Sequence, residues 1–252
     1  MTKKALKKLP FPTEICYLLG MCIIALGTVL MEHTGLGMIA MTAPAHILYL
    51  ILHPIIPFFT FGLASFLFQG LLLLALALIL RRFPPFYLFS FISAFFCAVL
   101  IDLFEHYVEL ACEAGGFWIF SHTSDSDLFL LLLGTTCYAF GVALLRRSYL
   151  APEVYELFAD EMSEEYHFSF SKVKTVYDCS SSALAILLSV VFLGTIDWDT
   201  IGWGTIICSI LDGVLIGGFY DFLARIHRPL DLLPLRHFFH RDLEAGKEGK
   251  EG

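Results

Sequence analysis

The chain has 252 residues, of which 58% are hydrophobic and 16% are charged, and its formal net charge is −8. Its mean hydropathy is +0.75, and a soluble domain of this size has no interior large enough for so much apolar surface. A nucleic-acid-binding domain is excluded too, because the basic residues are spread along the chain and do not form one patch. The composition therefore predicts a membrane protein whose main partner is the lipid bilayer.

Six apolar runs are each long enough to cross the hydrocarbon core of a bilayer as a helix. They cover residues 15–31, 55–80, 86–104, 128–145, 175–195 and 201–223. Helix is the expected backbone, because a segment in lipid must satisfy its own amide groups and no run alternates as a barrel strand would. The predicted fold is an all-α membrane protein with six transmembrane helices. We expect a single transmembrane domain over residues 1–252 that ends in a polar cytoplasmic tail, about residues 236–252.

The second half of the chain repeats landmarks of the first half in the same order. GTVLMEHTGL begins at Gly27 and GVALLRRSYL begins at Gly141, while TFGLASFLFQG at residues 60–70 corresponds to SFSKVKTVYDC at residues 169–179. Each copy carries three spans, an odd number, so the second copy enters the membrane from the opposite side. Two inverted three-helix repeats are typical of secondary transporters, whose ligand site lies where the copies meet. The predicted repeats cover about residues 15–105 and 128–223.

Lysine and arginine are concentrated at those span ends that a cytoplasmic amino terminus places inside the cell. The clusters are Lys3 to Lys8, Arg81 with Arg82, Arg146 with Arg147, and Arg225 with Arg228. Basic residues next to spans favour the cytoplasmic side, whereas acidic residues carry little weight. We therefore expect both termini to be cytoplasmic.

Each copy also holds a shorter segment between its first two spans. Residues 36–52 are apolar enough to compete as a seventh span, but a crossing there would place the second and third basic clusters outside. A re-entrant or interfacial helix broken near Pro44 is expected instead. The counterpart, residues 150–166, is amphipathic and acidic and cannot span. Pro152 suits the first turn of a helix, and the carboxylates are expected to keep that helix on the cytoplasmic surface.

These landmarks resemble the YczE/YitT-like bacterial integral membrane proteins, a group largely without assigned function. The resemblance rests on GLGMIAMTAPAHIL at residues 35–48, TFGLASFLFQ at 60–69, PFYLFSFISAFFCAVLIDLF at 85–104, FSFSKVKTVYDCSSSA at 168–183 and IGWGTIICSILDGVLIG at 201–217. It implies a multi-pass protein of the bacterial inner membrane and supplies no substrate. The sequence departs from the pattern at Ile39 and Ala40, where a proline is more common, and at Ser171, where a glycine is expected.

Asp178 is the strongest candidate for chemistry, because it lies about one turn into the fifth span with Lys174 four residues before it. That spacing places both side chains on one helical face, where they can pair. A charged group in lipid costs roughly 3 kcal/mol unless it is paired or hydrated, so its presence favours a polar cavity or a proton pathway. The alternative is a structural ion pair of Asp178 with Lys174 or Lys172. The equivalent position in the first copy is Gln69, which is polar but uncharged.

Two further carboxylates lie in spans. Asp212 lies near the centre of the sixth span among glycines, which allow close helix contact and can widen a cavity; packing alone is the alternative. Asp102 lies at the outer end of the third span, one turn before His106, and the two could relay a proton. Contact with headgroups is the alternative for Glu105 and His106.

Catalytic signatures are missing from the sequence, which has no GxSxG, P-loop or HExxH motif. The spans have no His-x-x-x-His or Glu-x-x-His spacing, and the seven cysteines form no CxxC pair. We therefore expect no enzyme, no catalytic residue, no cofactor and no metal.

The sequence favours a secondary transporter or permease for a small polar or anionic solute. The expected solute or proton pathway is lined by Asp178, Lys174, Lys172, Asp212, Asp102 and Gln69. The alternative is a non-transporting interaction or regulatory protein that acts on a partner through its acidic cytoplasmic helix. A homo-oligomer is compatible with either hypothesis.

Overall fold

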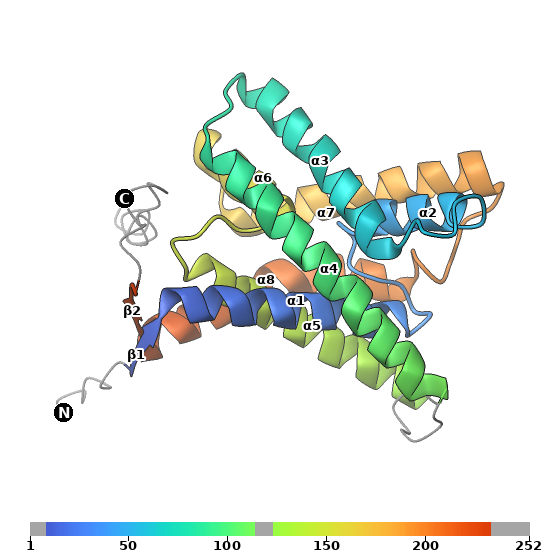
Figure 1. Ribbon diagram of the computed structural model, residues 1–252, viewed down its shortest axis with the longest axis horizontal. Helices are drawn as coiled ribbons and strands as arrows, with labels where there is room; N and C mark the ends of the chain where they lie inside the picture. Colours follow the sequence, from blue (N-terminus) through green and yellow to red (C-terminus); the bar gives the residue numbers. More distant parts are fainter. Residues whose placement is uncertain (1–8, 114–122, 233–252) are drawn as a thin grey trace.

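The computed structural model describes residues 9–113 and 123–232 (Figure 1). Its elements in chain order are β1 (Leu9–Pro12), α1 (Thr13–Glu32), α2 (Ala43–Leu52), α3 (Phe61–Leu80), α4 (Phe86–Glu113), α5 (Ser124–Arg146), α6 (Val154–Glu165), α7 (Phe170–Leu188), α8 (Trp203–Ile226) and β2 (His227–Leu230). A π-helical turn, Ser189–Leu193, continues α7. The first basic cluster and the predicted polar tail lie outside the described residues.

Six of these helices, α1, α3, α4, α5, α7 and α8, are long and apolar enough to cross a membrane, as the sequence predicts. Large apolar side chains such as Leu78, Ile210 and Phe222 remain exposed on the described part of the bundle. Apolar surface on this scale requires lipid in place of water. The protein is therefore a multi-pass integral membrane protein whose long helices contact the bilayer.

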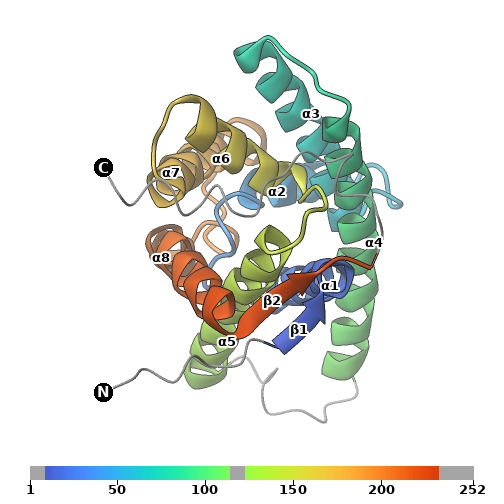
Figure 2. The same ribbon diagram turned by 90° about the vertical axis from the view of Figure 1, so that its left-hand side faces the viewer.

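The centre of the bundle is formed by α1 packed against α5 in antiparallel orientation (Figures 1 and 2). Gly20 lies against Gly141, and Gly27 lies against Gly134, so residue numbers rise along one helix as they fall along the other. A Cβ atom added at Gly20 would lie 2.9 Å from the Gly141 carbonyl oxygen, and one added at Gly27 would lie 2.7 Å from the Gly134 carbonyl oxygen. The glycines therefore let the two backbones approach more closely than any larger residue would allow.

The other helices surround this pair in two sets whose contacts correspond. Helix α4 packs on α1 as α8 packs on α5, and α3 packs on α4 as α7 packs on α8. The short helices follow the same scheme, since α2 contacts α3 and α7 while α6 contacts α7 and α3. Each of these contacts made by the first half thus has a counterpart in the second half.

Both short helices begin inside the bundle. Thr42, which precedes α2, is 4% exposed, and Glu153, which precedes α6, is also 4% exposed. Glu156, Asp160 and Glu161 of α6 are buried too, so the expectation that the carboxylates of this helix face water is wrong for these residues. The physical reason is that these carboxylates find hydrogen-bond and ion-pair partners within the protein, which offset the loss of water.

The second half of α6 lies beside two of the basic clusters. Arg82, just after α3, is 3.0 Å from a carboxylate oxygen of Glu161, and Arg146, the last residue of α5, is 3.0 Å from one of Asp160. Because both arginines reach the same short helix, these two clusters lie at one end of the molecule.

One pair of strands differs from the all-α expectation. β1 and β2 pair in parallel, from Leu9 opposite His227 to Pro12 opposite Leu230. They join the segment before α1 to the segment after α8 (Figure 2). These four-residue strands contain three prolines, and proline normally argues against a strand, so the sequence does not predict them.

Candidate functional site

Helix α7 carries a completely buried ion pair. Lys174 Nζ donates hydrogen bonds to both carboxylate oxygens of Asp178, at 3.0 and 3.2 Å, and neither side chain is exposed. The structure thus contains the pair that the four-residue spacing predicts.

Two more carboxylates face the Lys174 ammonium. Asp212 of α8 and Glu156 of α6 both interact with it electrostatically, and they are 1% and 2% exposed. Glu156 Oε1 accepts a hydrogen bond of 2.6 Å from the Tyr138 hydroxyl. Among the described residues, the second oxygen of Glu156 and both oxygens of Asp212 have no hydrogen-bond partner. We call Glu156, Lys174, Asp178 and Asp212 the charged cluster: one ammonium faces three carboxylates away from water.

Gln69 of α3 holds the beginning of α6 from the other half of the molecule. Its side-chain oxygen accepts a hydrogen bond of 3.0 Å from the Val154 N–H, and its Nε2 donates one of 3.2 Å to Glu153 Oε2. One turn earlier, the Ser65 hydroxyl lies 3.2 Å from the Tyr155 hydroxyl. Gln69 therefore binds the first residues of the helix that delivers Glu156 to the charged cluster.

Burial controls the ionisation of the two carboxylates on this part of α6. Desolvation raises the pKa of Glu153 above its ordinary value, and the hydrogen bond from Gln69 only partly opposes that rise. Desolvation likewise raises the pKa of Glu156, against the opposing effect of Lys174. Both groups therefore hold a proton more tightly than an exposed glutamate does.

A small cavity lies between the beginnings of the two short helices. Its volume is about 10 Å³, close to what a single water molecule needs. Its polar lining includes Thr28 of α1, Thr42 before α2, Ser65 of α3, and Glu153 and Glu156. Polar groups from both halves of the chain thus meet at this point.

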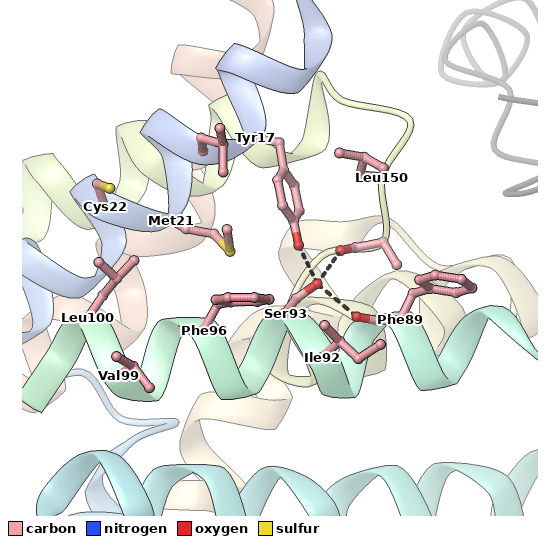
Figure 3. Close-up of a pocket in the computed structure, with 12 residues that line it drawn as sticks. Tyr17, Met21, Cys22, Phe89, Ile92, Ser93, Phe96, Val99, Leu100 and Leu150 are labelled. Carbon is pink, nitrogen blue, oxygen red and sulfur yellow. Dashed lines mark hydrogen bonds between the residues drawn. The ribbon is translucent and has the colours of Figure 1, made fainter. Parts of the chain in front are cut away.

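A larger cavity of about 360 Å³ lies between α1 and α4 (Figure 3). Its lining is mainly apolar and contains no carboxylate, ammonium or guanidinium group. The Tyr17 hydroxyl hydrogen-bonds to the Ser93 hydroxyl, which lies 2.9 Å from the carbonyl oxygens of Phe89 and Ala151. Such a lining suits an apolar chain, so this cavity does not compete with the charged cluster as a site for a polar solute.

The structure does not bring every expected site residue to the charged cluster. Asp102 of α4 lies against the beginning of α3, where its two oxygens accept hydrogen bonds of 2.8 Å from the Thr60 hydroxyl and the Gly62 N–H. Lys172 is exposed on α7, and His106 is exposed on α4. Of the residues expected to line a pathway, the structure thus brings Lys174, Asp178 and Asp212 together and places Gln69 at the beginning of α6.

A second polar network joins α1, α2 and the segment before α8. His46 Nε2 lies 2.9 Å from Glu32 Oε1, and His46 Nδ1 lies 2.7 Å from the Thr200 hydroxyl, which in turn donates to Asp197. This network fixes α2 against its neighbours.

Sequence reasoning missed three residues of the site: Glu153, Glu156 and Tyr138. The two glutamates lie in an acidic stretch that resembles a solvated surface. A usable signal was present, since Glu153, Glu156 and Asp160 follow one another at spacings of three and four and therefore share one helical face. Tyr138 carries no such signal, because an aromatic residue in an apolar span is ordinary.

In the part of the chain that the structure describes, no group of three or more His, Cys, Asp or Glu side chains is arranged to hold a metal ion. The fold and the site define a class: a multi-pass integral membrane protein with a buried cluster of charges in its second half, beside polar contacts that join the two halves. Residues 11–221 match a family described as a family of unknown function (DUF6198), and the chain belongs to that family. No curated protein and no solved structure matches the chain. The family match does not extend to the YczE/YitT-like name, which stays a resemblance carried by the motifs.

Proposed function

We propose that the protein is a secondary transporter of the cell membrane, built from two inverted repeats, α1–α4 and α5–α8. The antiparallel glycine contact between α1 and α5 carries this proposal. Half a turn about an axis through the crossing would exchange Gly20 with Gly134 and Gly27 with Gly141. The contact of Gly20 with Gly141 then becomes the contact of Gly134 with Gly27, and both are present. An axis of this kind, perpendicular to antiparallel spans, lies in the membrane plane, as inverted repeats require.

The contacts of α3 with α4 and of α7 with α8 support the same half-turn relation between the repeats. A Cβ atom added at Gly62 of α3 would collide with the carbonyl of Ala98 in α4. In the second half, a Cβ atom added at Gly213 of α8 would lie 2.8 Å from the Ser171 hydroxyl of α7. The sequence repeat pairs Gly62 with Ser171, so equivalent positions form the close helix crossing in each half.

Transport is the function that this arrangement serves best. In transporters of this architecture, short helices begin near the midplane, and their N-terminal ends and polar side chains form the solute site. Here α2 and α6 begin beside the same small cavity, and that cavity is lined from both repeats. Rocking of one repeat against the other would open the cavity to each side in turn.

The charges of the site favour a small polar or cationic solute over an anion. Three carboxylates surround one ammonium, and the ammonium is already bound to Asp178. An anion would add repulsion in a medium of low dielectric constant, whereas a cation would be attracted.

The alternative of a partner-binding protein finds less support. It requires the carboxylates of α6 to be free for a partner, but Asp160 and Glu161 pair with Arg146 and Arg82, and Glu156 lies in the charged cluster. The acidic face of this helix is directed at the protein itself.

Access to the cavity from both sides of the membrane tests the proposal. Single cysteines replace Thr42 or Ser65 in full-length protein without its native cysteines, reconstituted in liposomes. A thiol reagent that cannot cross lipid is then added outside or enclosed inside. A transporter should be labelled from each side, because the cavity opens alternately.

The matched control is Ser90→Cys, which replaces a serine of α4 that is just as buried but lies away from the cavity. It should stay unlabelled from both sides. Labelling of Thr42→Cys and Ser65→Cys from one side only, or at the rate of the control, would overturn the transporter proposal.

A further inference from the structure

We propose that the charged cluster is a proton-binding site in which Asp212 and Glu156 each carry a proton while the site is closed. The arrangement of the cluster alone supports proton binding. The use of this proton to drive the movement of a solute rests on the proposed transport function.

The proposal follows from the charges around Asp212. The titratable groups that face it are Cys208 on its own helix, Lys174 and Asp178 on α7, Tyr138 on α5 and Glu156 on α6. Lys174 is the one cation in this set. If all three carboxylates were ionised, the cluster would carry two uncompensated negative charges in a region closed to water, which is a costly arrangement.

The hydrogen bonds show which carboxylates take the protons. Asp178 accepts two hydrogen bonds from Lys174, which stabilise its ionised form. Asp212 is 1% exposed, and neither of its oxygens has a partner among the described residues; Glu156 is 2% exposed and has one such oxygen. An ionised carboxylate in that state would have lost its hydration without replacement. Protonation of Asp212 and Glu156 makes the cluster neutral, with Asp178 and Lys174 as its one ion pair.

A proton fits the site better than a metal ion does. Metal binding needs several ligand atoms that converge on one point, and in the described chain no three His, Cys, Asp or Glu side chains do so. A proton needs only one oxygen. The raised pKa of Glu156, caused first by burial, agrees with this assignment.

The same charge balance couples the release of a proton to the binding of a cation. When the site opens to water, the Asp212 carboxyl can release its proton to solvent and become a carboxylate. A singly charged cationic solute can then enter and supply the lost positive charge, so the closed site stays neutral. The reverse exchange on the other side restores the carboxyl group. The proposed transporter would thus exchange protons for a small organic or inorganic cation.

Infrared spectroscopy of the purified full-length protein tests the proton site without any solute. A protonated carboxyl has a carbonyl stretching band that a carboxylate lacks. We expect such bands at about pH 7, roughly three pH units above the ordinary pKa values of carboxyl groups. Asp212→Asn should remove one contribution, Glu156→Gln the other, and the double variant both.

Asp102→Asn is the matched control, because Asp102 is also a carboxylate of a long helix but is stabilised by Thr60 and Gly62 outside the cluster. It should leave these bands unchanged. If Asp212→Asn fails to fold, Asp212→Glu keeps the carboxyl and should shift the band without removing it. Glu153, whose pKa is also raised by burial, can leave a residual band in the double variant. Bands that are missing at about pH 7, or that keep their full wild-type intensity in the double variant, would overturn the proton site. Failure of the transporter proposal would be seen separately, in the two-sided labelling, which does not depend on protonation.

Discussion

Lys174 and Asp178 lie one helical turn apart on α7, joined by two hydrogen bonds and fully enclosed by the bundle. The pair is part of a larger set, since Asp212 and Glu156 approach the same ammonium from two other helices. Removing either member of the pair therefore disturbs the charge balance of three helices.

Asp178→Ala should destabilise the protein strongly. It leaves the Lys174 ammonium without its nearest carboxylate, and breaking a buried pair in this way costs about 3 to 5 kcal/mol. Asp178→Asn combined with Lys174→Gln should recover much of that loss, because neither charge is then left alone. Thermal unfolding in detergent measures both changes. Cys179→Ala, at the exposed neighbouring position of α7, is the control and should be close to neutral. A single Asp178→Ala variant as stable as this control would contradict the role of the pair.

Gly27→Ala should weaken the contact between α1 and α5. The added methyl group would lie 2.7 Å from the carbonyl oxygen of Gly134, so the backbones must separate. Overpacking of this kind costs about 1 to 3 kcal/mol. Gly217→Ala is the control, because nothing lies within 4 Å of a Cβ atom at that position of α8. It should be neutral or slightly stabilising, since alanine favours helix. The melting temperatures of the two variants should differ accordingly, and equal values would argue against the close crossing.

The stability of the protein should fall as the pH rises through the raised pKa of Glu153. Burial raises that pKa above the ordinary value of 4.5, so the folded state holds the proton more tightly than the unfolded state. The resulting stabilisation is complete below the unfolded pKa and is lost as the pH rises through the folded one. Glu153→Gln should flatten this part of the curve of melting temperature against pH. Asp125→Asn, which removes an exposed carboxylate of α5, is the control and should keep the wild-type curve.

The basic end of the molecule should face the cytoplasm. Arg82 and Arg146 both reach α6, and the bias of arginine and lysine places that end inside. In intact cells, a cysteine at Asp125, in the first turn of α5, should react with a thiol reagent that cannot cross the membrane. A cysteine at Ser163, near the end of α6, should react only after the cells are opened. Rapid labelling of the second position from outside would reverse the orientation.

The long helices could be predicted because each span is specified locally. Twenty or so apolar residues in a row are sufficient to define a span, and all six runs lie within the long helices of the structure or overlap them. The pairing of Lys174 with Asp178 is equally local, because a spacing of four residues settles it.

The burial of α6 could not be predicted, because it depends on partners that are distant in the chain. Gln69 is 84 positions from Glu153, and Arg82 is 79 positions from Glu161. Without those partners, an acidic amphipathic helix is most stable in water, and the sequence shows only that preference. The assembly of Asp212, Glu156 and Lys174 was hidden for the same reason, since each comes from a different helix.

The strand pair at the chain ends restricts how the molecule can move. β1 and β2 connect the first residues of α1 to the last residues of α8, and Thr13 and Glu14 reinforce the link through hydrogen bonds with Asp231 and the Leu232 N–H. This strand pair therefore joins the two halves of the chain at one end of the molecule. A motion that separates the halves would have to pivot about the strand pair, so the widest opening is expected at the end of the bundle that lies farthest from it.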